Sequence, residues 1–166
     1  MAYFARYRTS SGAATLAAVL LVLVFGSPMY VSWVQGHTDV NTAGGWFMRL
    51  LSWPAWRFSA GDSVQNLIAD DLRAILLILL TFVFLLAFAG SIASRAQFFG
   101  GWGAYVFAGA LAALLSAFLL TNPSLLTAFQ AAGGGAIYGL FVGWIVGFAS
   151  LGGYRGTRAT TTVKEA

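Results

Sequence analysis

A histidine and three aspartates, all between the first two apolar stretches, are the side chains of this sequence best suited to chemistry. His37 is the only histidine, and Asp39, Asp70 and Asp71 follow it. An imidazole together with carboxylates can hold a metal ion or act as general acid and base. Their spacing matches no metal-ligand motif, and a single loop histidine is ordinarily only solvated. We predict no metal site and no catalytic residue, with a membrane enzyme acting at His37, Asp70 and Asp71 on the outer face as an alternative.

Other chemical motifs are missing from the sequence. It contains no cysteine, which excludes a thiol nucleophile and a cysteine-ligated metal. The glycine run at residues 133–135 is followed by no Lys-Ser or Lys-Thr pair, so it is not a phosphate loop. Apart from Arg73 at the start of the second one, the apolar stretches carry no charged residue, which argues against a coupled transporter or a pump. We therefore expect no cofactor.

The composition places most of the chain in lipid. Of its 166 residues, 59% are hydrophobic and 8% are charged, whereas soluble domains carry about 25% charged residues. The nine basic residues form no cluster, so nucleic acid is not an expected partner. The composition predicts the lipid bilayer as the main partner.

Four apolar stretches are long enough to cross a bilayer, which takes about 20 residues. They cover residues 13–34, 72–94, 102–121 and 123–150. We expect an all-α, integral membrane four-helix bundle that forms a single domain over residues 1–166, with a polar C-terminal tail at 151–166. A cleaved signal peptide is the alternative for the first stretch, but no small-x-small cleavage site follows its apolar core. Pro28 predicts a kink near the far end of this span.

The long loop after the first span contains a tryptophan-rich segment at residues 44–58. Its aromatic and basic members are Trp46, Trp53, Trp56, Arg49 and Arg57. On a helical wheel its few polar residues occupy a narrow arc, which is typical of an amphipathic helix lying in the membrane interface. We predict that these five residues anchor the first extracytoplasmic loop, with a re-entrant or protein-packed segment as the alternative. Pro54 predicts the end of this helix after Trp53.

The second helix is expected to begin before the bilayer. Asp62, followed by Gln65 three residues later, is close to a capping box. Asp70 and Arg73 lie three residues apart, the spacing of an ion pair on one helix face. We predict that this pair forms just outside the membrane.

Small residues recur at every fourth position of the last span, and a similar row lies on the third. The two rows consist of Ala131, Gly135, Gly139, Gly143 and Gly147, and of Gly109, Ala113 and Ala117. Residues four apart lie one above the other on a helix, and small rows let membrane helices approach closely. A tight turn near residue 122 brings Gly109 opposite Gly135 or Ala136. Because the groove of a straight helix winds through roughly 160° over this row, we expect its inner half (Gly139, Gly143 and Gly147) to pack against another element, which is the first or second span or a different subunit.

The basic residues orient the chain. With four spans, one side holds Arg6, Arg8, Arg95, Arg155, Arg158 and Lys164. The other side holds Arg49, Arg57 and Arg73 together with every aspartate. The positive-inside rule then predicts a multi-pass plasma-membrane protein with both termini in the cytoplasm.

Three functions remain open at this stage. Dense small-residue faces without chemistry favour a non-catalytic accessory or assembly subunit of a larger membrane complex. The alternatives are a homo-oligomer, or a pore, built on the row Gly135–Gly139–Gly143–Gly147, and the outer-face enzyme described above.

Overall fold

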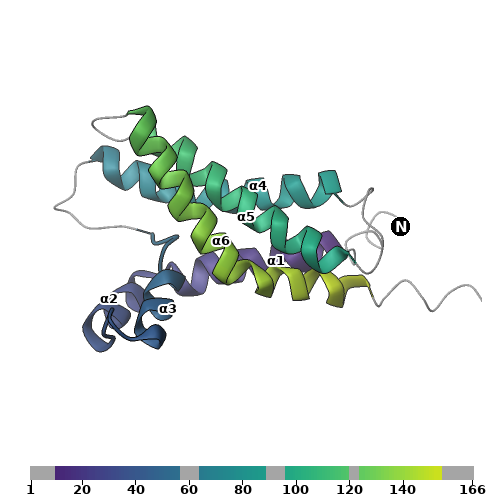
Figure 1. Cartoon of the computed structure of the whole chain (residues 1–166), viewed down its shortest axis with the longest axis horizontal. Coiled ribbons are helices and arrows are strands. Elements are labelled where there is room, and N and C mark those ends of the chain that lie inside the picture. Colours follow the sequence, from purple (N-terminus) through teal and green to yellow (C-terminus); the bar gives the residue numbers. More distant parts are fainter. Residues whose placement is uncertain (1–9, 57–63, 89–95, 120–123, 155–166) are drawn as a thin grey trace, which may run out of the picture.

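The computed structural model describes residues 10–56, 64–88, 96–119 and 124–154, and every regular element within them is an α-helix (Figure 1). The helices are α1 (Ser10–Phe25), α2 (Pro28–His37), α3 (Ala43–Leu51), α4 (Val64–Phe88), α5 (Gln97–Ala117) and α6 (Leu125–Tyr154). The predicted all-α class is confirmed. The predictions for Arg6, Arg8, Arg57, Asp62, Arg95, the turn at 122–123 and the tail from 155 onward fall outside the described residues.

Three helices are long and apolar enough to cross a membrane, over Leu67–Phe88, Gln97–Ala117 and Leu125–Gly153. A fourth crossing exists if α1 and the helix after it are counted as one bent span. The chain therefore has the helices of a membrane protein. The last of them runs four residues beyond the predicted end at 150, to Tyr154.

The first predicted span, 13–34, is not one helix. α1 ends at Phe25, and α2 starts at Pro28 with a bend of 60°. The Ser27 hydroxyl accepts a hydrogen bond from the backbone N–H of Tyr30 at 3.3 Å, which makes Ser27 the N-cap of the new helix. Pro28 suits the first helical position because it has no N–H to satisfy. These local features begin a second helix where a kink was expected.

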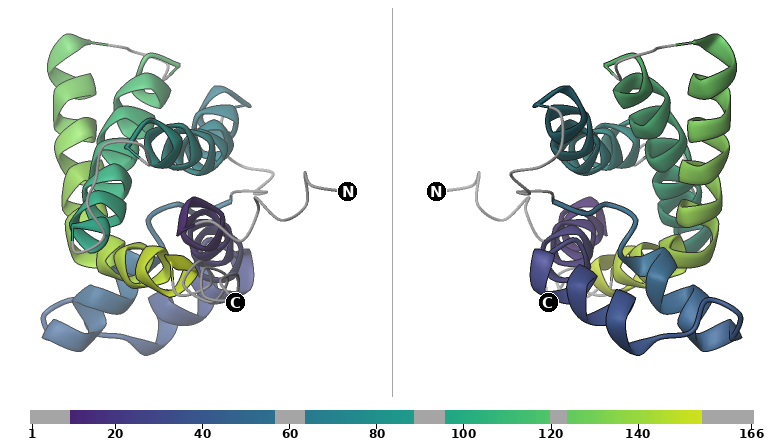
Figure 2. Two further views of the ribbon diagram at one scale, coloured as in Figure 1. Left: turned by 90° about the vertical axis from the view of Figure 1, so that its right-hand side faces the viewer. Right: turned by 90° about the vertical axis from the view of Figure 1, so that its left-hand side faces the viewer.

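Four helices pack side by side and two branch away. α5 packs on both α4 and α6, and α1 packs on α4 and α6. α1 and α4 run along the long axis, whereas α5 and the first half of α6 cross it obliquely (Figures 1 and 2). We call these four helices the body. α2 and α3 contact each other and project from one end of the body, and we call them the arm.

The most extensive contact in the body is between α5 and α6. A Cβ atom on Gly109 would lie 2.5 Å from the carbonyl oxygen of Gly135, and one on Gly135 would collide with the carbonyl oxygen of Gly109. Ala113 and Ala117 are buried, whereas Ala131 is partly exposed. The two backbones therefore touch at Gly109 and Gly135, with no room for a side chain.

The expectation that an element other than the third span packs against the inner half of the row is wrong, because α5 covers it. Cβ atoms on Gly139, Gly143 and Gly147 would lie 2.6, 2.8 and 2.9 Å from atoms of α5. Those atoms belong, in order, to Val106, Trp102 and Phe98. The expectation assumed straight helices, but α6 changes direction along its length (Figure 1). The curved α6 keeps its small row against α5.

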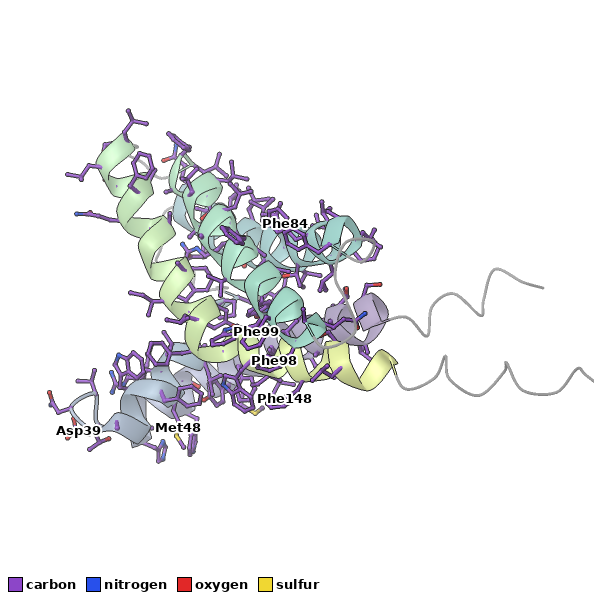
Figure 3. All side chains as sticks on the ribbon, turned by 45° about the vertical axis from the view of Figure 1, so that its right-hand side comes forward. Asp39, Met48, Phe84, Phe98, Phe99 and Phe148 are labelled. Atoms are coloured by element: carbon purple, nitrogen blue, oxygen red, sulfur yellow. The ribbon has the colours of Figure 1, made fainter. Side chains whose placement is uncertain are left out.

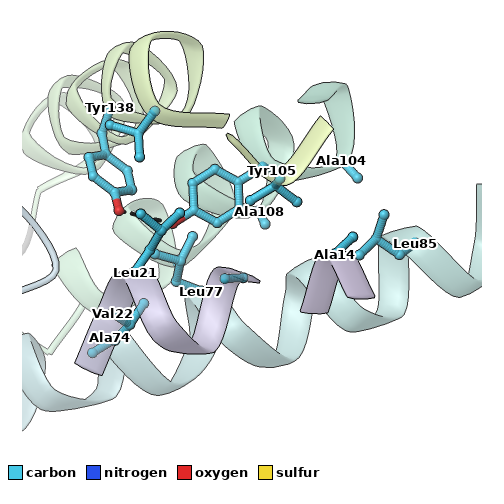
Figure 4. Close-up of a cluster of buried hydrophobic side chains, with 14 of the residues drawn as sticks. Ala14, Leu21, Val22, Ala74, Leu77, Leu85, Ala104, Tyr105, Ala108 and Tyr138 are labelled. Carbon is cyan, nitrogen blue, oxygen red and sulfur yellow. Dashed lines mark hydrogen bonds between the residues drawn. The ribbon is translucent and has the colours of Figure 1, made fainter. Parts of the chain in front are cut away.

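The centre of the body is apolar apart from a few hydroxyl groups (Figure 4). Its fully buried members include Leu77, Tyr105, Tyr138, Val142 and Val146. Thr81 donates to the carbonyl of Leu77 at 2.6 Å, which satisfies its hydroxyl within its own helix. Hydroxyl groups bonded in this way can lie in an apolar interior at little cost.

Candidate functional site

A mostly buried ion pair lies where α4 meets α5. The guanidinium of Arg73 donates to the Asp70 carboxylate at 2.6 Å, so the predicted pair forms. The two side chains are only 22% and 16% exposed. Arg73 Nε also lies 3.3 Å from Ser116 Oγ on α5, and Ser116 in turn donates to the Ala113 carbonyl. The pair thus joins two helices, which the spacing along one helix did not predict.

The segment Leu51–Trp56, which we call the strap, leads from the end of α3 into the body. Leu51 is 7% exposed and Pro54 is fully buried. The ring of Trp53 stacks on Tyr138 of α6, with centroids 4.8 Å apart. The guanidinium carbon of Arg73 lies 5.4 Å from the centroid of the Trp53 ring, within the range of a cation–π interaction. The indole therefore connects α4 to α6.

Beneath Trp53, two phenols meet in the centre of the body. The hydroxyls of Tyr105 on α5 and Tyr138 on α6 are 2.9 Å apart, and both side chains are fully buried (Figure 4). A hydrogen bond in an apolar interior is stronger than the same bond in water. Polar and aromatic contacts therefore run from the α4 ion pair to the centre of the body.

The strap is also fixed at the break between α1 and α2. The backbone N–H of Trp56 donates to the carbonyl of Gly26 at 2.9 Å. A Cβ atom on Gly26 would collide with the Pro54 carbonyl oxygen and would lie 3.2 Å from Trp56 Cδ1. Only glycine lets the strap pass this closely. The indole N–H of Trp56 is buried without a hydrogen-bond partner among the described residues.

The arm is held together by Arg49 and Tyr30. The Arg49 guanidinium donates to the backbone carbonyls of Gln35 and Thr38 at 3.2 and 2.7 Å, at the C-terminal end of α2. A cation at this position satisfies carbonyls that the helix leaves unpaired. The Tyr30 hydroxyl donates to the Met48 carbonyl at 3.0 Å. The guanidinium of Arg49, which was predicted as an interfacial anchor, thus donates its hydrogen bonds within the arm.

The arm exposes several large apolar side chains beside polar ones such as Gln35, Asp39 and Asn41. Its most exposed large apolar side chains are Met29, Trp33, Val40, Trp46 and Met48. Figure 3 labels Met48 and Asp39 at this end of the molecule. Trp46 is 39% exposed and meets Phe141 of α6 edge to face at 5.0 Å. The three predicted anchoring tryptophans therefore differ: Trp46 lies on the surface of the arm, whereas Trp53 and Trp56 belong to the strap.

The residues considered for metal or acid–base chemistry come from different elements, and they form no metal-binding cluster in the described part of the chain. His37 is the last residue of α2, and its ring stacks on the Trp33 ring with centroids 5.4 Å apart. Its Nδ1 atom lies 2.9 Å from the carbonyl oxygen of Trp33. Asp70 is engaged with Arg73 on α4. Among residues 10–56, 64–88, 96–119 and 124–154, no three His, Cys, Asp or Glu side chains gather where they could hold a metal ion.

Comparison with known protein families, with curated proteins and with solved structures found no match. The strap and the tyrosine pair were not foreseen from the sequence. Trp53 and Tyr138 are 85 positions apart, and no periodic pattern connects residues so distant. Two residues in the sequence pointed toward the strap without predicting its contacts. Pro54 predicts that the helix before it ends, and Gly26 precedes the pair Ser27-Pro28.

Proposed function

We propose that the chain is a non-catalytic, multi-pass plasma-membrane protein that serves as an accessory or assembly subunit of a larger membrane complex. In this proposal α1, α4, α5 and α6 cross the bilayer as a four-helix bundle with both termini in the cytoplasm, as the basic residues predict. The arm lies at the outer face, in the membrane interface. There it meets lipid and a partner membrane protein.

The observation that carries the proposal is the arm with its exposed apolar surface. Met29 is 82% exposed, Trp33 is 47% exposed and Met48 is 41% exposed, all on helices that project from the body. Large apolar side chains exposed on such a projection are typical of a protein or membrane contact. Aromatic rings and methionine are also the side chains enriched where proteins bind one another.

The length of α1 supports an interfacial position for the arm. α1 has 16 residues, which corresponds to about 24 Å at the rise of an α-helix. The hydrocarbon core of a bilayer is about 30 Å thick. If α1 starts at the inner boundary of the hydrocarbon core, it ends several ångströms short of the outer boundary. α2 then begins at this depth. An amphipathic helix lying in the interface is buried to a similar depth.

The packing of the small row favours this function over the alternative homo-oligomer or pore. The glycines on which an oligomer would be built, Gly135, Gly139, Gly143 and Gly147, all face α5 of the same chain. The row is therefore not a free surface. We therefore assign the contact with another protein to the side chains that the arm exposes.

Purification of the tagged full-length chain in a mild detergent tests the proposal. We expect a defined set of partner proteins to co-purify with the parent, and to be lost in the variant Met29→Ser/Trp33→Ser. Phe107→Ser is the matched control, because Phe107 is 62% exposed on α5, away from the arm. Loss of the same partners in Phe107→Ser, or a single-component ring with conductance in planar bilayers, would contradict the proposal and favour the oligomer.

A further inference from the structure

The strap is non-helical backbone inserted among helices. Residues 52–54 form a turn and residues 55–56 have no regular structure, yet Pro54 is fully buried. Irregular backbone at membrane depth is tolerated where protein buries it and satisfies its polar groups. The bond from the Trp56 N–H to the Gly26 carbonyl provides one such partner. The strap therefore depends on the body for its conformation.

The strap contacts α4, α6 and the break between α1 and α2, each in a different way. α4 contributes the Arg73 guanidinium and α6 the Tyr138 ring, on which the indole of Trp53 stacks. The break between α1 and α2 contributes Gly26, whose lack of a side chain leaves room for the strap. The strap thus covers Tyr138, whose hydroxyl meets Tyr105 in the centre of the body.

We propose that the strap is a closure over the outer end of the body, with Trp53 as the latch between Arg73 and Tyr138. Because the strap continues directly from α3, displacement of the arm withdraws Trp53. The centre of the body around Tyr138, Tyr105 and Ala74 then opens to water at the outer end only. This inference does not depend on which partner the arm binds.

Single-cysteine accessibility tests the closure, because the parent chain has no cysteine. Ala74→Cys reports on the outer half of the body, since Ala74 is fully buried one residue after Arg73. Ala14→Cys reports on the opposite end, where Ala14 is fully buried in the second turn of α1. The full-length protein in lipid nanodiscs exposes both ends to a charged methanethiosulfonate reagent, and intact mass gives the reaction rate.

We expect slow modification of both reporters in the parent. Trp53→Ala should accelerate modification of Ala74→Cys at least tenfold, because it removes the stacking and cation–π contacts together. Each contact favours the closed position of the strap by roughly a factor of several. The rate at Ala14→Cys should change less than about twofold. Trp53→Phe, which keeps an aromatic ring on Tyr138, should restore most of the protection.

Two further variants keep the test decisive. Gly26→Ala displaces the strap from its α1 side without changing Trp53, and it should also accelerate modification of Ala74→Cys. Trp33→Ala removes an arm tryptophan whose ring contacts are with Tyr30 and His37 of the same helix and not with the body, and it should leave the rate unchanged. An unchanged rate in both strap variants, an equal acceleration at Ala14→Cys, or an equal effect of Trp33→Ala would overturn the proposal.

Discussion

Gly109 and Gly135 face each other across α5 and α6 so closely that neither position has room for a Cβ atom. A matched control lies one residue away, because a Cβ on Gly134 would meet nothing within 4 Å. Gly134 and Gly135 both lie in α6, so they differ in their surroundings and not in their backbone conformation. This contrast separates the effect of packing from that of helix propensity.

The first prediction uses that contrast. Gly135→Ala should lower the stability of the folded monomer by about 1–3 kcal/mol, as overpacking does. Gly134→Ala should be neutral or stabilising, because alanine is a better helix former than glycine. Thermal unfolding in detergent measures both. Equal effects of the two variants would mean that α5 and α6 do not meet at Gly135.

The second prediction concerns the inner half of the row. Gly143→Leu should destabilise the monomer as Gly135→Leu does, because Trp102 and Tyr105 of α5 lie 2.8 and 3.2 Å from a Cβ at this position. Size-exclusion chromatography combined with thermal unfolding distinguishes the outcomes. A folded monomer that has lost a higher-order assembly would instead make Gly143 an intersubunit contact. Gly133→Leu is the control, since its surroundings are open.

The third prediction concerns the tyrosine pair. Tyr138→Phe and Tyr105→Phe should each cost about 1 kcal/mol or more, because each leaves a buried hydroxyl without a partner. The double variant should cost no more than either single one, since no orphaned hydroxyl remains. A double-mutant cycle of unfolding free energies measures this coupling. Additive costs would show that the two hydroxyls do not interact.

The fourth prediction concerns orientation and uses two open, described positions. Gly36 on α2 and Gly152 near the end of α6 both have free space around a Cβ. A cysteine at Gly36 should react with an impermeant maleimide added to intact cells, and one at Gly152 should react only after permeabilisation. This follows from the distribution of Lys and Arg. The reverse pattern would invert the proposed topology.

The fifth prediction separates the tryptophans. In single-tryptophan variants, Trp46 fluorescence should be quenched most strongly by lipids brominated near the headgroup, because tryptophan prefers this level and Trp46 is 39% exposed. Trp53 should be protected from aqueous iodide by its contacts with Tyr138 and Arg73. Full quenching of Trp46 by iodide, with no effect of the lipids, would remove the arm from the interface.

Local patterns in the sequence predicted the features that depend on residues near one another. Apolar length predicted membrane helices, because a spanning helix must satisfy its backbone internally over about 20 residues. The three-residue spacing of Asp70 and Arg73 predicted their ion pair, because this spacing places both on one helix face. Pro54 predicted the end of the arm helix, and α3 ends at Leu51, within three residues of it.

Only the tertiary structure decided what the arm and the small row contact. The strap joins Trp53 to Tyr138 and Trp56 to Gly26, which are 85 and 30 positions apart, and such pairings depend on how complete helices pack. The four-residue row showed that α6 has a groove, but not that α5 follows the groove to Gly147. That depends on the curvature of α6, which helical periodicity does not encode. The composition alone indicated a protein of the lipid bilayer, because so few polar groups cannot cover a surface in water.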